Sequence, residues 1–198
     1  WDLFRYPGVR SDSDMFTFAY VFRPWMVPKV LSEGALVREY VQETAQEFGV
    51  DRHIRFGLKI VKAAWSSTHK LWTVTALREA TAEQISYTCN FFISCTGYYD
   101  YDHAYQPEFA GLETFKGQCI HPQFWPEGLD YKGKKVVIIG SGATAVTLVP
   151  TMVADAAHVT MLQRTPTYYF IAPTLERTIE IIGKVLPTRW ACTGVNTR

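Results

Sequence analysis

The spacing of hydrophobic residues predicts one amphipathic helix early in the chain, followed by several strands. Apolar side chains recur at a period near 3.6 over residues 35–48, and Gly49 follows at a position typical of a helix C-cap. Strand-like patterns then cover three stretches, at about 53–65, 70–77 and 84–96. Within the last of these, the mostly apolar run 91–97 ends at a glycine, which predicts a buried strand entering a turn.

Two tracts show no regular period. Residues 1–28 are irregular and rich in aromatic side chains, with a turn signal at Pro7-Gly8, so we expect a loop that packs on something. Residues 98–133 carry several prolines and glycines and predict a long loop. Loops of that length are uncommon in compact domains unless they are functional, so this tract is a candidate for function.

Composition narrows the class of protein. The chain has 198 residues, 47% of them apolar, with 20 Lys and Arg against 19 Asp and Glu. This balance is typical of a globular protein and excludes a nucleic-acid binder that relies on bulk positive charge. No apolar run approaches the roughly 18–20 residues of a membrane span, and no secretion signal is visible. We therefore expect a cytoplasmic protein.

The cysteines predict neither a disulfide nor a metal site. Cys89, Cys95, Cys119 and Cys192 form no C-x-x-C pair and do not stand near histidine at the spacing of zinc ligands. Reduced thiols in a cytosol follow, and we expect Cys95 and Cys119 to be inert and buried.

The strongest local motif is a glycine turn between a strand and a helix. An apolar strand at 136–139 leads into G-x-G-x-x-A, and a helical stretch continues to about Ala157. The first glycine allows a tight turn, the second lets the backbone approach a pyrophosphate, and the alanine keeps the helix close to the strand. Free N–H groups at the helix N-terminus would bind the anion. The motif residues are Gly140, Ser141, Gly142, Ala143, Thr144 and Ala145.

The end of the next strand indicates which dinucleotide binds. Residues 158–163 predict the second strand of this Rossmann-type unit, and NAD-binding units commonly place a carboxylate at its end. Here Gln163, Arg164 and Thr165 occupy that place, and a guanidinium suits a 2′-phosphate. The sequence therefore favours NADPH over NADH. The alternative is that Arg164 is an ordinary exposed cation at the end of the strand.

A second motif lies upstream of the turn. The stretch 115–126 matches F-x-G-x-x-x-H-x-x-x-W-P at all five fixed positions, which are Phe115, Gly117, His121, Trp125 and Pro126. With the glycine turn downstream, this pattern resembles the fingerprint of type I Baeyer–Villiger monooxygenases, in the branch of ethionamide-activating, FAD-containing enzymes. The resemblance extends over nearly the whole chain and is loose over the last 25 residues.

This resemblance implies an α/β protein with two dinucleotide-binding, Rossmann-like domains, both truncated here. The expected division is a partial FAD-binding domain at 1–110, a linker at 111–133 and a partial NADPH-binding domain at 134–198. The chain starts at Trp1 rather than Met, and we expect it to be an internal piece. The family's first FAD-binding glycine turn would then precede Trp1, and its active-site arginine would follow residue 198.

The resemblance also assigns cofactor contacts. Trp1, Asp2 and Leu3 would continue an FAD-contacting segment, and Arg10, Ser11 and Asp12 would form a loop between flavin and nicotinamide. Asp12 would be the acid beside the reacting flavin, with a helix cap or turn former as the alternative. Further FAD contacts would come from Ile60, Thr96 and Gly97, and NADPH contacts from 140–145, Arg164 and Thr165.

Within the fingerprint, the resemblance assigns His121 and Trp125 a role in reporting cofactor state to the active site. Alternatively, His121 is a loop histidine bonded to the backbone, and Trp125 is a packing anchor.

The implied activity is insertion of oxygen from O2 beside a ketone carbonyl, or oxygenation of sulfur, with FAD and NADPH supplying the redox chemistry. Three alternatives stay open. A related N- or S-oxygenating flavin monooxygenase is disfavoured by Trp125-Pro126, and a disulfide reductase by the lack of a redox cysteine pair. A non-catalytic NADP-binding module is the third, and the isolated chain is expected to be inactive.

Overall fold

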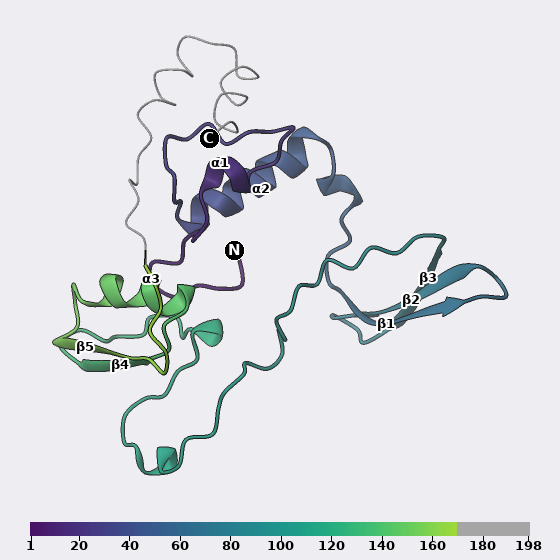
Figure 1. Ribbon diagram of the computed structural model, residues 1–198. Coiled ribbons are helices and arrows are strands. Elements are labelled where there is room, and N and C mark those ends of the chain that lie inside the picture. The colour runs from purple at the N-terminus through teal and green to yellow at the C-terminus, as the bar shows by residue number, and fades with distance from the viewer. Residues whose placement is uncertain (170–198) are drawn as a thin grey trace, which may run out of the picture. The chain divides into compact units, whose positions relative to one another are not determined.

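The computed structural model describes residues 1–169, which form an α/β structure (Figure 1). The predictions for Cys192 and for the last part of the NADPH-binding domain fall outside these residues. The helices are α1 (Met15–Phe18), α2 (Gly34–Glu47) and α3 (Ala143–Met152). The strands are β1 (Leu58–Ser66), β2 (Leu71–Arg78), β3 (Gln84–Cys89), β4 (Lys135–Ile139) and β5 (His158–Leu162).

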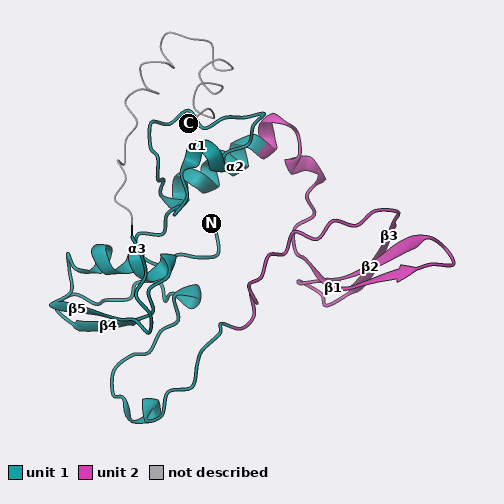
Figure 2. Ribbon diagram, viewed as in Figure 1, with its two compact units in different colours: residues 1–44, 104–198 teal, residues 45–103 magenta. Residues whose placement is uncertain are grey.

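The chain divides into two compact units (Figure 2). The first comprises residues 1–44 and the chain from residue 104 onward, and the second comprises residues 45–103. We describe each unit by itself. The predicted FAD-binding, linker and NADPH-binding parts are defined by the cofactor that each would bind, whereas the two units are defined by compactness. That division therefore stays a prediction.

A small apolar core holds the N-terminal part of the first unit together. Met15, Trp25, Val37 and Tyr40 are buried against one another. Helix α2 contributes two of these, as the predicted period required, and ends before Gly49, whose φ of +63° is that of a left-handed C-cap.

The prediction that residues 1–28 are irregular throughout was wrong over one helical turn. The Asp14 carboxylate accepts hydrogen bonds from the N–H groups of Phe16 and Thr17, at 3.0 and 3.2 Å, and so caps α1. This places Met15 in the core. The expectation that the aromatic tract packs on something is confirmed by the buried Trp25.

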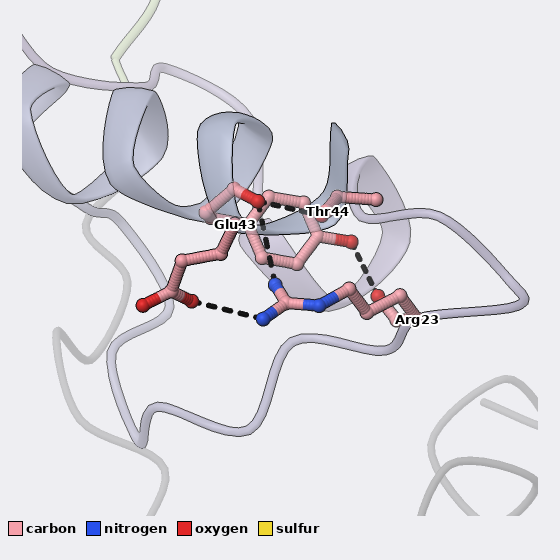
Figure 3. A network of polar contacts seen from close by, with 4 residues as sticks. Arg23, Glu43 and Thr44 are labelled. Atoms are coloured by element: carbon pink, nitrogen blue, oxygen red, sulfur yellow. Dashed lines mark hydrogen bonds and ion pairs between the residues drawn. The ribbon is translucent and has the colours of Figure 1, made fainter. Parts of the chain in front are cut away.

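A polar network fixes the segment after α1 to helix α2 (Figure 3). The guanidinium of Arg23 donates to a Glu43 carboxylate oxygen at 2.9 Å and to the Tyr40 carbonyl at 3.3 Å. The Tyr40 hydroxyl donates to the Arg23 carbonyl and accepts from the Tyr20 N–H at 2.9 Å. Burial raises the pKa of Tyr40 above its usual value near 10.

The second unit contains an antiparallel sheet in the order β1-β2-β3. Strand β2 buries Val74 and Ala76 on one face, as its alternating pattern predicts. The prediction of a buried strand at 91–97 was wrong, because these residues form no strand and the side chains of Phe91 and Ile93 are 80% and 71% exposed. An apolar run becomes a strand only beside a partner with free backbone groups, and β3 ends at Cys89.

The nucleotide-binding pattern forms a β-α-β unit within the first compact unit. Strands β4 and β5 pair in parallel, with Ile139 opposite Leu162 at their carboxyl ends. Helix α3 connects them and buries Ala145, Leu148 and Met152. The helix continues through Pro150 and ends at Met152, so the predicted extent to about Ala157 was too long.

Candidate functional site

The glycine turn occupies the carboxyl end of β4 and leads directly into α3, as predicted. Gly140 has a φ of +130°, which disfavours any side chain, and its N–H donates to the Leu162 carbonyl at 2.8 Å. Gly142 is the N-cap of α3 in extended conformation. Ala145 is 5% exposed, so the small side chain lets the helix approach the strands.

The N-terminus of α3 is shaped to receive an anion. Gly142 has no side chain to cap the helix, so the first N–H groups point outward together with the positive end of the helix dipole. A Cβ at Gly140 or at Gly142 would meet no atom within 4 Å, so the backbone here faces open space. The phosphate groups of a dinucleotide fit this arrangement.

The segment after β5 folds back to the glycine turn. The hydroxyl groups of Ser141 and Thr167 lie 2.7 Å apart, and the Tyr169 hydroxyl donates to the Ser141 carbonyl at 3.4 Å. Arg164 and Thr165, which are exposed, therefore belong to the same edge of the sheet as the turn. The structure brings these predicted NADPH residues together.

Sequence reasoning missed Thr167 and Tyr169. Their position two to four residues beyond Thr165 carries no motif, and only the return of the chain reveals their contacts with Ser141.

The predicted FAD-contacting residues at the N-terminus lie in the first unit. Trp1 is 40% exposed, and its ring lies against Gly34, where an added Cβ would be 3.2 Å from Cε3. Asp2 forms an ion pair with Arg38 at 2.8 Å, a contact that no sequence pattern predicts. Leu3 is 49% exposed.

The loop of Arg10, Ser11 and Asp12 is anchored by its backbone. Ser11 is 3% exposed, its N–H donates to the Ser32 carbonyl at 2.8 Å, and its hydroxyl accepts from the Ser32 N–H at 2.9 Å. Asp12 is exposed, and the helix cap nearby is Asp14 rather than Asp12. Arg10 pairs by its backbone with Glu33, whose pKa is held below its usual value by hydrogen bonds from the Lys29 ammonium group.

The remaining FAD-assigned residues lie in the second unit. Ile60 belongs to β1 at an irregularity in the pairing with β2, and its side chain is 50% exposed. Thr96 accepts a hydrogen bond at its carbonyl from the Tyr101 hydroxyl at 3.4 Å, and Gly97 has a φ of +71°. That these residues contact the same FAD as those of the first unit stays a prediction.

The fingerprint residues form a series of local turns. Gly117 lies under the ring of Phe115, where a Cβ would be 2.4 Å from Cζ. His121 accepts a hydrogen bond at Nδ1 from the Gln123 N–H at 3.2 Å and caps a short 3₁₀ turn, Pro122–Phe124. Trp125 and Pro126 follow and are half-buried. The histidine thus bonds to backbone, one of the two roles that the sequence allowed.

Two expectations about cysteines were wrong. Cys95 and Cys119 are exposed rather than buried, and both lie outside the helices and strands. Among residues 1–169, no cluster of three or more His, Cys, Asp or Glu is arranged to hold a metal ion. In the same range, no helix combines the length and the apolar character needed to cross a bilayer.

With this geometry described, comparison with known proteins identifies the family. The flavin-binding monooxygenase-like family matches residues 10–178. The chain belongs to the flavin-binding monooxygenase-like family. This confirms the resemblance drawn from the two motifs, since the related proteins carry names of FAD-containing monooxygenases.

Two mycobacterial relatives are similar to nearly all of this chain. The FAD-containing monooxygenase EthA of Mycobacterium tuberculosis is 50% identical over 196 residues, which is 98% of this chain and 40% of EthA. MymA of the same organism, also named as an FAD-containing monooxygenase, is 60% identical over 96% of this chain and 39% of MymA. The chain spans about two-fifths of the length of these relatives.

Solved structures confirm the α/β, two-domain class of this family member. OTEMO in complex with FAD and NADP matches with a TM-score of 0.74 and 28% identity, over 93% of this chain and 36% of OTEMO. Cyclohexanone monooxygenase from Rhodococcus sp. Phi1 bound to NADP+ gives a TM-score of 0.72 and 26% identity, over 93% of this chain and 35% of its own.

Proposed function

We propose that this chain is part of an NADPH- and FAD-dependent monooxygenase of the Baeyer–Villiger type. The observation that carries the proposal is the glycine turn at the carboxyl ends of β4 and β5, with an uncapped α3 behind it. Relatives and structural neighbours named for FAD and NADP support it. The substrate class would be ketones or sulfides together with O2, and the compartment would be the cytoplasm.

The residues present fit NADPH. The N-terminus of α3 would hold the pyrophosphate through its backbone N–H groups, and Gly140 and Gly142 leave the space for it. Arg164, at the end of β5, would bind the 2′-phosphate by charge-assisted hydrogen bonds, since Gln163 offers no carboxylate to a ribose hydroxyl.

The flavin would supply the reaction with O2, and the chain would position it. Trp1, Asp2 and Leu3 would line one side of the FAD site, and Arg10 to Asp12 would lie between the two cofactors. Asp12 would place a negative charge beside the flavin, and the buried Ser11 keeps that loop in a fixed place. Ile60, Thr96 and Gly97 would add contacts to FAD.

The fingerprint would act as a linker between the two nucleotide sites. The His121 cap and the Phe115–Gly117 contact give it a defined turn conformation. A rigid linker would pass changes at the NADPH site to the flavin, and it would take no part in the bond-making itself.

The test is turnover by the full-length protein that carries this sequence. With NADPH, O2 and a panel of linear and cyclic ketones and sulfides, we expect one oxygen atom from labelled O2 in an ester, lactone or sulfoxide. A related N- or S-oxygenating enzyme would give sulfoxides without esters. Oxidation of NADPH with formation of H2O2 alone, for every substrate tried, would contradict the proposal.

A further inference from the structure

The N-terminal loop contains a type II β-turn whose third residue must be glycine. The Val9 N–H donates to the Tyr6 carbonyl at 3.2 Å, Pro7 occupies the second position, and Gly8 the third with a φ of +74°. This conformation at the third position strongly favours glycine. The turn therefore has a fixed shape, set by the Pro-Gly pair.

The same glycine packs against helix α3. A Cβ at Gly8 would lie 2.2 Å from Thr151 Oγ1, 3.2 Å from Thr151 Cβ and 3.3 Å from Thr147 Cγ2. Both segments belong to one compact unit (Figure 2), and the start of the chain passes beside α3 in Figure 1. The contact thus leaves no room for a side chain at position 8.

The receiving surface of α3 is also fixed. The Thr147 hydroxyl donates to the Ala143 carbonyl, and the Thr151 hydroxyl donates to the Thr147 carbonyl, both at 2.9 Å. These bonds hold both threonine side chains in one rotamer, because a change of χ1 would break them. Both threonine hydroxyls donate within α3 itself, so they meet the turn by packing.

Immediately after Gly8, hydrogen bonds attach the chain to residues 32–34. The Gly34 N–H donates to the Val9 carbonyl at 2.8 Å, and Ser11 and Ser32 exchange the backbone and hydroxyl bonds described above. Only Val9 separates Gly8 from the Arg10–Asp12 loop. A displacement of the turn relative to α3 must therefore move that loop or break these bonds.

We propose that the Pro7-Gly8 turn is a positioning contact that sets the Arg10–Asp12 loop relative to helix α3. The inference rests on the proposed function, in which α3 holds NADPH and this loop lies beside the flavin. Gly8 itself touches neither cofactor site. Since misplacement by about 1 Å can slow a reaction by roughly 100-fold, the contact should control hydride transfer more than NADPH affinity.

The experiment measures anaerobic flavin reduction by NADPH, per bound flavin, in the full-length enzyme and in Gly8→Ala. We expect the limiting rate to fall about tenfold or more, as overpacking shifts the turn. The Kd for NADP+, measured by titration, should change less than about twofold, because the phosphate-binding turn is untouched. A merely destabilised protein would lose bound flavin and keep its rate per flavin.

Matched variants separate the contact from the strain of the turn. Gly57→Ala is the control, because Gly57 has a φ of +69° and no atom within 4 Å of its added Cβ, and it lies outside the linker and the assigned cofactor contacts. Gly8→Ala with Thr151→Ala, which removes Oγ1 and Cγ2, should restore the rate to the level of Gly57→Ala. Gly8→Ala with Thr151→Val, which refills the same space without a hydroxyl, should restore nothing.

A second variant covers the case in which Gly8→Ala fails to fold. Thr151→Leu enlarges the contact from the helix side with the turn unchanged, and it should slow hydride transfer in the same way. Equal rates for Gly8→Ala and Gly57→Ala, or no recovery in the Thr151→Ala double variant, would overturn the inference.

The proposed function can fail separately. If wild-type enzyme oxidises NADPH but oxygenates no substrate, the reduction assay still tests the contact. If wild-type enzyme does not reduce its flavin with NADPH at all, both the proposed function and this role of Gly8 are wrong. Thermal unfolding of the same variants would then show only whether the packing contact exists.

Discussion

At the scale of single residues, we propose that the side chain following β5 decides which dinucleotide binds. Arg164 is exposed at the sheet edge that carries the glycine turn, so its guanidinium is free to meet a 2′-phosphate. We expect Arg164→Gln to weaken NADPH binding by about 1.5–3 kcal/mol, roughly 10- to 150-fold, and to leave NADH binding unchanged.

Titration of both nucleotides against the full-length protein checks this expectation. Lys135→Gln is the matched control, because it removes one exposed positive charge at the opposite end of the β4–β5 pair. Equal weakening of NADPH and NADH in Arg164→Gln would show that Arg164 does not recognise the 2′-phosphate.

The two glycines of the turn should fail in different ways when substituted. Gly140→Ala places a side chain on a residue with a φ of +130°, so it should reduce stability by about 1–3 kcal/mol. Gly142→Ala has a φ of −78° and open space around it, so it should fold normally and lose NADPH affinity. Urea denaturation and nucleotide titration of both variants distinguish these outcomes, and identical behaviour would contradict the assignment.

At the scale of elements, the attachment of helix α2 rests on the Tyr40 hydroxyl. Tyr40→Phe keeps the ring contacts with Trp25 and Arg23 and removes bonds to the Tyr20 N–H and the Arg23 carbonyl. Because the Tyr20 N–H and the Arg23 carbonyl each lose one hydrogen bond, we expect a loss of about 1–3 kcal/mol in chemical denaturation.

The same hydroxyl predicts a dependence on alkaline pH. Burial raises the pKa of Tyr40 in the folded state, so the folded chain holds this proton more tightly than the unfolded chain. The free energy of unfolding should therefore be unaffected by this group below about pH 10 and fall as the pH rises further. Tyr40→Phe should lose this part of the alkaline decline, and an unchanged profile would contradict it.

Prediction from sequence worked best for elements with a complete local signal. Helix α2 and the turn into α3 were predicted because hydrophobic period, glycine position and flanking strand agree there. The prediction of a strand at 91–97 was wrong because apolar composition does not specify a pairing partner. Helix α1 was missed because four residues are too few for a period, although Asp14 carried the cap signal.

At the scale of the whole molecule, the β4–β5 pair has one apolar face that is exposed among the described residues 1–169. Helix α3 packs on one side, and Val137, Ile139 and Leu162 are 62%, 57% and 56% exposed on the other. Parallel sheets are ordinarily covered on both faces. Because the chain spans about two-fifths of its relatives' length, we expect a longer protein to bury this face.

Val137→Arg tests that expectation. In a full-length protein the charge would be buried without a partner, so we expect destabilisation of about 3–5 kcal/mol. In the isolated 198-residue chain the same change should lie within about 0.5 kcal/mol, as at other surface positions. Glu127→Arg, at an exposed position, is the control, and urea denaturation of both lengths gives the comparison.

The sequence by itself determined the β4–α3–β5 unit and the family, because both depend on short-range order. A tight turn, a close backbone approach and a helix start require fixed residues at fixed spacing, from Gly140 to Ala145 and from Phe115 to Pro126. Only the tertiary structure decided which distant residues meet, such as Gly8 with Thr151, Ser141 with Thr167, and Asp2 with Arg38. Such contacts depend on the path of the chain between them, which no local pattern of side chains records.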